Sequence, residues 1–114
     1  MNLEHLNKAQ INELALMLND EFPEFVRTFI SHSEVLISSL KQQLNTNDNS
    51  AFIISIHSLK GSCRNIGAEL LANHCLQIEA EARNDNYASI DPELMSICAE
   101  FNNLKATLQK LARI

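Results

Sequence analysis

The sequence predicts an all-α protein, an antiparallel up-down-up-down four-helix bundle with an additional short helix at its N-terminus. Apolar residues recur at spacings of three and four along most of the 114 residues, which is the periodicity of helices that bury one face. Only two glycines and two prolines are present, so tight turns have few places to form. At this length we expect a single domain over residues 1–114 with a single core.

The first two predicted helices differ in length. A short helix over residues 8–18, with Asn7 as its N-cap, keeps its apolar residues on one face, namely Ile11, Leu14, Ala15 and Leu18. A long helix over residues 22–44 follows, and Pro23 is compatible with it because the first turn of a helix accommodates proline. The polar residues 45–49 then favour a turn. We expect the short helix to cover one end of the bundle.

The remaining helices have clear boundary signals. A third helix is predicted over residues 50–66, and Gly67 fits the position where a left-handed conformation ends a helix. A fourth is predicted over residues 68–83. After a loop, Asp91 and Pro92 are typical of a helix start, with the aspartate as N-cap and the proline in the first helical position. Long amphipathic helices with short connections are expected to pack antiparallel.

Composition and charge exclude several functions. A net charge of −5 disfavours nonspecific nucleic-acid binding, which needs clustered lysines and arginines. No apolar run approaches the ~20 residues that cross a bilayer, and the start of the chain lacks the basic and apolar segments of a signal peptide. Three cysteines without a CxxC pair are most simply small apolar residues of a cytosolic chain. We therefore expect a cytoplasmic protein that binds neither nucleic acid nor membrane.

Residues 56–71 are the most informative segment. His57 lies beside the apolar face of the third helix rather than on it, so its ring is expected to face solvent; that face comprises Phe52, Ile56, Leu59, Cys63 and Ile66. Lys60 and Gly61 follow one turn later on the same side as His57. A glycine inside a helix costs about 1 kcal/mol relative to alanine. Gly61 therefore indicates a need for a small residue beside the histidine.

The spacing in this segment resembles the signature of histidine-containing phosphotransfer (HPt) domains. That signature has a histidine, then a lysine and a glycine three and four positions later, then Gly-Ala and leucines. The matching residues here are His57, Lys60, Gly61, Gly67, Ala68, Leu70 and Leu71. Ile56 departs from the family, which often has a smaller residue there, but it faces the bundle interior and so affects packing more than chemistry. The resemblance implies a helical-bundle fold, in agreement with the periodicity.

The resemblance also implies that His57 carries a phosphoryl group. Imidazole has an unperturbed pKa near 6.5, so much of it is neutral at cytosolic pH and a ring nitrogen can attack phosphorus. Gly61 leaves room for the active site of a partner. Lys60 and Arg64 are expected to supply positive charge for the phosphoryl oxygens.

Ile53 and Ile54 lie one turn before the histidine, and at least one of them is expected at the surface as part of a docking patch. The implied partners are receiver domains of response regulators and a sensor histidine kinase, including hybrid kinases. The receiver is expected to bring Mg²⁺, so this chain needs no cofactor of its own. The protein would relay phosphoryl groups between receiver aspartates in a multistep two-component pathway, as a monomeric carrier rather than an autonomous enzyme.

Two other classes of function compete with this interpretation. A helical adaptor that is never phosphorylated would leave His57 incidental. A metal-binding bundle would combine His74 with the three cysteines, since zinc accepts both kinds of ligand; these are Cys63, Cys75 and Cys98. The cysteines fall on apolar faces and no i, i+4 pair of ligands is present, so we expect no metal site.

The other histidines and acidic residues are expected to be structural or solvated. His5 and His32 are predicted to face solvent. Three acidic residues near the end of the fourth helix are predicted to form a solvated acidic face rather than a site, namely Glu79, Glu81 and Asp85.

Overall fold

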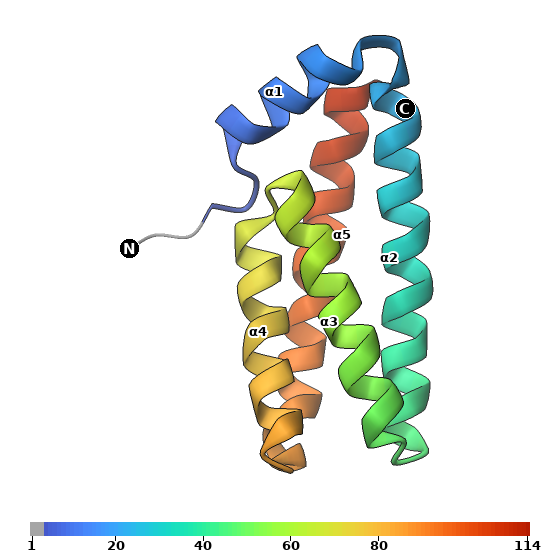
Figure 1. The fold of residues 1–114 in the computed structure, drawn as a ribbon, viewed down its shortest axis with the longest axis vertical. Coiled ribbons are helices and arrows are strands. Elements are labelled where there is room, and N and C mark those ends of the chain that lie inside the picture. The colour runs from blue at the N-terminus through green and yellow to red at the C-terminus, as the bar shows by residue number, and fades with distance from the viewer. Residues whose placement is uncertain (1–3) are drawn as a thin grey trace.

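The computed structural model describes residues 4–114 and consists mainly of long α-helices (Figure 1). The helices are α1 (Lys8–Leu18), α2 (Phe22–Asn45), α3 (Asn49–Ile66), α4 (Glu69–Arg83) and α5 (Ile90–Ala112), and the 3-10 turns η1 (Asn19–Glu21) and η2 (Tyr87–Ser89) precede α2 and α5. The four long helices run antiparallel, and α1 lies across one end. The predicted four-helix bundle with a short N-terminal helix is confirmed. Within residues 4–114, no helix is both long and apolar enough to cross a membrane.

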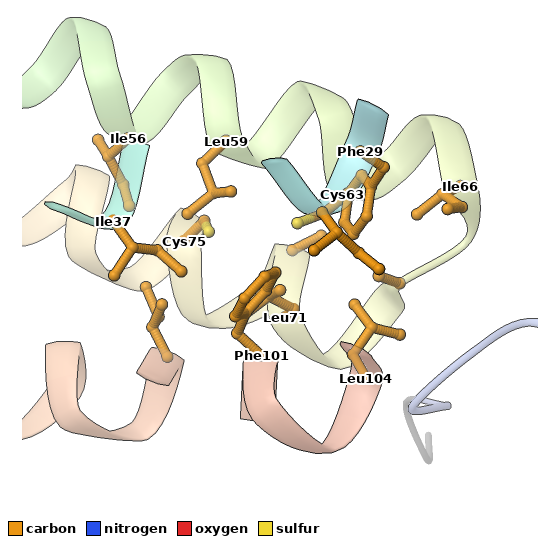
Figure 2. Close-up of a cluster of buried hydrophobic side chains, with 14 of the residues drawn as sticks. Phe29, Ile37, Ile56, Leu59, Cys63, Ile66, Leu71, Cys75, Phe101 and Leu104 are labelled. Carbon is orange, nitrogen blue, oxygen red and sulfur yellow. The ribbon is translucent and has the colours of Figure 1, made fainter. Parts of the chain in front are cut away.

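The four long helices enclose one apolar core. Each of them contacts the next in the chain, and α5 returns to contact α2, which closes the ring. Figure 2 shows buried side chains contributed by all four, among them Phe29, Ile37, Ile56, Leu59, Cys63, Ile66, Leu71, Cys75, Phe101 and Leu104. Burying a side chain such as Ile56, which is fully inaccessible, stabilises the fold by about 1.5–3 kcal/mol.

Most helix boundaries follow the local signals in the sequence. The side chain of Asn7 accepts a hydrogen bond from the backbone N–H of Gln10, so the predicted N-cap of α1 is confirmed. Gly67 ends α3 in the left-handed conformation with φ of 86°. A Cβ atom there would also approach the side chains of Gln10 and Asn7 to 3.2–3.3 Å, so both the backbone angle and the space favour glycine.

The start of α5 differs from the prediction. The helix begins at Ile90, so Asp91 lies inside the first turn and is not the N-cap; Ser89 holds that position without a side-chain cap bond. The preceding turn η2 already brings the backbone into a helical conformation, and Ile90 is fully buried in the core. Burial of Ile90 therefore extends the helix beyond the local capping signal, while Asp91 still interacts favourably with the helix dipole.

Helix α1 closes the end of the bundle where α3 finishes. The Gln10 side-chain amide donates to the backbone carbonyls of Arg64 at 2.8 Å and Asn65 at 3.1 Å. The backbone N–H of Asn7 donates to the carbonyl of Gly67 at 2.8 Å. These bonds satisfy carbonyl groups that the end of α3 leaves without helical partners. The expectation that the short helix covers one end is confirmed.

The prediction that His5 faces solvent is wrong. Its Nδ1 atom contacts the carboxylate of Glu100, and its Nε2 atom lies 3.2 Å from the hydroxyl of Thr107, both on α5. His5 therefore ties the segment before α1 to the last helix. His32, in contrast, is exposed as predicted.

The two neighbouring isoleucines Ile54 and Ile56 should respond oppositely to substitution by aspartate. Ile56 is fully buried, so Ile56→Asp should lower the free energy of unfolding by about 3 kcal/mol or more. Ile54 is 71% exposed, so Ile54→Asp should change it by about 0.5 kcal/mol or less. Urea unfolding followed by far-UV circular dichroism measures both. A folded Ile56→Asp protein together with an unfolded Ile54→Asp protein would contradict the orientation of α3.

Candidate functional site

His57 projects from the outer surface of α3. Its side chain is 66% exposed, whereas Ile56 and Leu59 on the same helix are fully buried. Because those residues hold the apolar face of α3 against the core, they set the rotation of the helix and turn the imidazole outward. The predicted exposure of His57 is confirmed.

The imidazole is held by Glu79 from the neighbouring helix α4. His57 Nδ1 lies 3.0 Å from Glu79 Oε2. The same oxygen accepts a hydrogen bond from Arg83 Nη2 at 3.1 Å, and Glu79 Oε1 accepts one from the Lys60 ammonium group. Only 7% of the Glu79 side chain and 11% of the Lys60 side chain are exposed. One buried carboxylate therefore joins three basic side chains from α3 and α4.

The pKa of Glu79 is shifted strongly by these surroundings. Burial of the carboxylate acts to raise its pKa, but hydrogen bonds from Lys60, Arg83 and His57 and the charge of Lys60 outweigh burial and lower the pKa to about 2. Glu79 is consequently ionised at neutral pH. An ionised carboxylate can only accept hydrogen bonds, so the proton in its contact with His57 lies on Nδ1.

This hydrogen bond determines which ring nitrogen is reactive. With the proton on Nδ1, neutral imidazole carries its free lone pair on Nε2. Nδ1 is occupied by Glu79, whereas the exposed ring leaves Nε2 available to an incoming group. The arrangement suits a nucleophile that attacks through Nε2 and has a carboxylate behind it to stabilise positive charge on the ring.

Lys60 and Arg64 occupy different environments. Lys60 is buried and its ammonium group is bound to Glu79, rather than extended toward solvent as expected for a direct phosphoryl contact. Its direct action on phosphoryl oxygens stays a prediction. Arg64 is exposed one turn beyond Lys60, on the outer surface of α3.

The packing of the protein does not require glycine at position 61. A Cβ atom at this position would meet nothing within 4 Å, and the residue lies exposed within α3. Next to it, Ser62 lines a cavity of about 160 Å³ between α2 and α3, together with Phe25, Phe29 and His32. The open space beside His57 is thus on the outside of the bundle, where only another molecule can use it.

The two predicted docking residues separate by depth. Ile54 is 71% exposed, which confirms the prediction that at least one of the two isoleucines lies at the surface. Ile53 is half-buried and packs against the core. Of this pair, Ile54 is therefore the one whose apolar side chain lies at the surface.

The prediction that Glu79 belongs to a solvated acidic face is wrong, because the packing of α3 on α4 covers it. Asp85 is exposed as predicted, while Glu81 is half-buried and accepts hydrogen bonds from Asn86 and Ser89. Sequence reasoning also missed Arg83. Its position four residues after Glu79 is a signal for a pair on one helix face, but nothing local indicates that His57 and Lys60 join this pair.

The cysteines contribute to packing. Cys63 on α3 and Cys75 on α4 are fully buried in the core (Figure 2). The contact with the Cys75 thiol and burial raise the pKa of Cys63, so the Cys63 side chain remains a neutral thiol. In residues 4–114, no three histidine, cysteine or acidic side chains gather in a way that could hold a metal ion.

Comparison with known proteins identifies the family. The sequence model of the Hpt domain matches residues 24–113, so the chain belongs to the Hpt domain family. It is 29% identical over 109 residues to histidine-containing phosphotransfer protein 2 of Arabidopsis thaliana, covering 90% of this chain and 70% of that protein. The chain is accordingly a histidine phosphotransfer protein of two-component phosphorelay signalling, a phosphoryl carrier whose family partners with histidine kinases and receiver domains.

Solved structures share the fold over nearly the whole chain. HptB from Pseudomonas aeruginosa PAO1 superposes with a TM-score of 0.93 at 28% identity, covering 98% of this chain and 97% of that one. The maize phosphotransfer protein ZmHP2 has the same fold, with a TM-score of 0.86 at 24% identity, covering 96% of this chain and 84% of that one.

The low pKa of Glu79 predicts how stability depends on pH. A carboxyl group whose pKa falls from 4.5 to about 2 on folding stabilises the fold above pH 4.5, and this contribution is lost as the pH falls toward 2. The loss should be about 2 kcal/mol at pH 3 and about 3 kcal/mol once Glu79 is fully protonated. Urea unfolding at a series of pH values measures it.

Glu79→Gln should remove this part of the pH dependence and should also destabilise the protein at neutral pH, because Lys60 stays buried without its carboxylate. Glu13→Gln, at an exposed position on α1, is the control and should leave the pH profile unchanged. Equal pH profiles for the wild type and Glu79→Gln would contradict the assigned role of Glu79.

Proposed function

We propose that His57 is the residue that carries the phosphoryl group. The observation that carries this proposal is an exposed imidazole whose Nδ1 atom is bound to an ionised carboxylate, next to a bare glycine. His32 is also exposed, but among residues 4–114 no carboxylate contacts its ring. His5 and His74 use their Nδ1 atoms for contacts with Glu100 and Glu93 and are far less exposed. His57 is therefore the histidine best suited to the activity of the family.

The proposed phosphoryl transfer needs no added acid or base, because every bond, charge and proton is accounted for by the two reacting groups. The lone pair of His57 Nε2 attacks the phosphorus of an aspartyl phosphate on a receiver domain. The N–P bond forms as the P–O bond to the aspartate breaks, and the aspartate leaves as a carboxylate. The ring then bears a positive charge with its proton still on Nδ1, where Glu79 at 3.0 Å stabilises it. Transfer to a second receiver aspartate reverses these steps, with Mg²⁺ expected in the receiver rather than in this chain.

We propose that the receiver docks over the outer surface of α3 and the adjoining part of α2. Gly61 allows the partner backbone to approach, the exposed Ile54 provides an apolar anchor, and Arg64 provides positive charge at the edge of the contact. Lys60 contributes indirectly, because its buried ammonium group donates a hydrogen bond to Glu79, which in turn contacts His57. The same face serves donor and acceptor receivers in turn, because only one imidazole is involved.

Three further expectations stay predictions. We propose that the protein acts as a monomeric carrier without catalytic activity of its own, since the groups assembled around His57 bind and orient it and none is placed to bind a nucleotide. A cytoplasmic location stays a prediction, as does the single domain over residues 1–114.

The central experiment is phosphorylation by a panel of phosphorylated receiver domains. We expect one phosphoryl group per chain, stable in alkali and labile in acid, that maps to His57. His57→Gln should abolish labelling, whereas His32→Gln, which replaces another exposed histidine, should leave it unchanged. Labelling of His57→Gln at the wild-type level would overturn the assignment.

The open space beside Gly61 predicts that a larger side chain at this position impairs phosphotransfer without destabilising the fold. Gly61→Gln should reduce phosphotransfer from a receiver by more than tenfold, because a long side chain would occupy the space that the partner needs. It should raise the free energy of unfolding by about 0.5–1 kcal/mol, since glutamine favours a helix more than glycine does. Rapid-quench kinetics and urea unfolding measure the two effects.

Ser38→Gln on α2, in the groove that faces α5, is the matched control, because it introduces the same side chain on a different face. It should leave the transfer rate unchanged. Wild-type transfer by Gly61→Gln would show that the glycine does not serve partner approach.

A further inference from the structure

Arg83 on α4 is the exposed cation among the residues that contact Glu79. Its side chain is 57% exposed, and its Nη2 atom donates to Glu79 Oε2 at 3.1 Å. The same oxygen contacts Nδ1 of His57 at 3.0 Å, so the guanidinium and the imidazole flank one oxygen atom. A guanidinium has five N–H donors, and this contact uses one of them. The other donors are at the surface beside the proposed carrier histidine.

Lys60 and Arg64 are less suited to bind a phosphoryl group on His57. The Lys60 side chain is 11% exposed and its ammonium group donates to Glu79 Oε1, so moving it outward would leave a buried carboxylate with less compensation. Arg64 is exposed, but it lies seven residues after His57, which corresponds to about 10 Å along the axis of α3. Arg83 is therefore the exposed cation that a single carboxylate oxygen joins to the ring.

The contact of Arg83 is the most readily exchanged of the three contacts that Glu79 makes with basic side chains. Arg83 reaches the carboxylate with an exposed side chain, so water can replace it, whereas the Lys60 ammonium group is enclosed together with the carboxylate. Once His57 carries a phosphoryl group on Nε2, its ring is positively charged and attracts Glu79 more strongly. Arg83 is then the donor that the carboxylate needs least.

The charges of these side chains favour an additional anion. Lys60 and Arg83 are cations and Glu79 is the anion that they share, so the three side chains together hold one positive charge in excess. A phosphoryl group brings negative charge and three strong acceptor oxygens. Guanidinium matches two such oxygens with parallel N–H groups, which an ammonium group cannot do. The exposed excess charge therefore fits a group that is present only after transfer.

We propose that Arg83 binds the phosphoryl group on His57. After the N–P bond has formed, the guanidinium turns from Glu79 Oε2 to the phosphoryl oxygens, while Lys60 stays on Glu79 Oε1 and the carboxylate stays on Nδ1. Arg83 remains protonated throughout, so no proton moves. This role rests on the proposed function, because it requires His57 to be the carrier. Arg83 thereby stabilises the phosphorylated state relative to the free protein.

Side-chain NMR signals of Arg83 report the contact directly. The protein, labelled with ¹⁵N in arginine, is phosphorylated with potassium phosphoramidate, whose P–N bond breaks and releases ammonia as the N–P bond to His57 forms. We expect the guanidinium signals of Arg83, identified by their absence in Arg83→Lys, to shift on phosphorylation. Those of Arg113, the exposed residue that follows α5, should not shift. His57→Gln should show no shift of either residue after the same treatment.

A transfer equilibrium measures the energetic effect. With a receiver domain that phosphorylates the wild type, Arg83→Gln should shift the equilibrium toward the phosphorylated receiver by about fivefold, because phosphohistidine loses a charge-assisted contact. Glutamine keeps an N–H donor for Glu79 but lacks the charge. Arg83→Lys should recover part of the effect, since it restores the charge without the paired N–H groups. Arg113→Gln removes the same charge elsewhere and should leave the equilibrium unchanged.

A double-mutant cycle separates direct binding from an effect through Glu79. Direct binding leaves most of the fivefold effect of Arg83→Gln in a Glu79→Gln background, whereas a role in holding Glu79 alone removes it and overturns the proposal. Circular dichroism establishes that each variant is folded; if Glu79→Gln is not, the Arg83 signals of the wild type decide.

Failure of this proposal is distinguishable from failure of the proposed function. The role of Arg83 is overturned if its guanidinium signals stay in place while His57 is phosphorylated, or if Arg83→Gln leaves the transfer equilibrium unchanged. A phosphoryl group that maps to another residue of the wild type overturns the proposed function itself.

Discussion

The buried carboxylate of Glu79 is the interaction on which the arrangement of the site depends. Taking a carboxylate out of water is costly unless hydrogen bonds and opposite charges replace the lost hydration. Lys60, Arg83 and His57 provide these, and the pKa of Glu79 falls to about 2 as a result. All three donors must stay within hydrogen-bonding distance of one carboxylate, and this requirement fixes their positions relative to one another.

This constraint connects the packing of the bundle to the reactivity of the ring. Glu79 belongs to α4, whereas His57 and Lys60 belong to α3, so the hydrogen bonds form only when the two helices pack at their native distance and rotation. The contact fixes the proton on Nδ1 and orients the imidazole, although most of the ring is in water. A site built on two packed helices is also more rigid than one built on loops. The imidazole of His57 is therefore held in one orientation at the surface of the bundle.

The two ends of the bundle satisfy their polar groups in different ways. At the end covered by α1, the side chain of Gln10 and the backbone of Asn7 bond the carbonyl groups at the end of α3. At the other end, Gln43, Asn49 and Tyr87 keep buried polar atoms without partners around a cavity. The contrast indicates that the unpaired atoms are not a general property of the chain ends. Between the two ends, the middle of α3 carries the proposed phosphotransfer site, His57, above the apolar core.

The amino-acid sequence by itself determined the features that depend on local periodicity and local backbone preference. The spacing of apolar residues placed Ile56 inside and His57 outside, and Asn7 and Gly67 marked the ends of α1 and α3 through interactions within a few residues. The HPt signature around His57 could be read for the same reason, since a motif on one helix is a fixed local geometry.

Only the tertiary structure decided which side chains meet across helices. Glu79 looked like a surface residue because two of the three side chains that donate to it, Lys60 and His57, lie 19 and 22 positions earlier in the chain. His5 was likewise drawn to Glu100 by the path of the segment before α1, and burial of Ile90 overrode Asp91 as the start of α5. In each case the deciding energy comes from burial and pairing between distant segments, which exist only once the helices have packed.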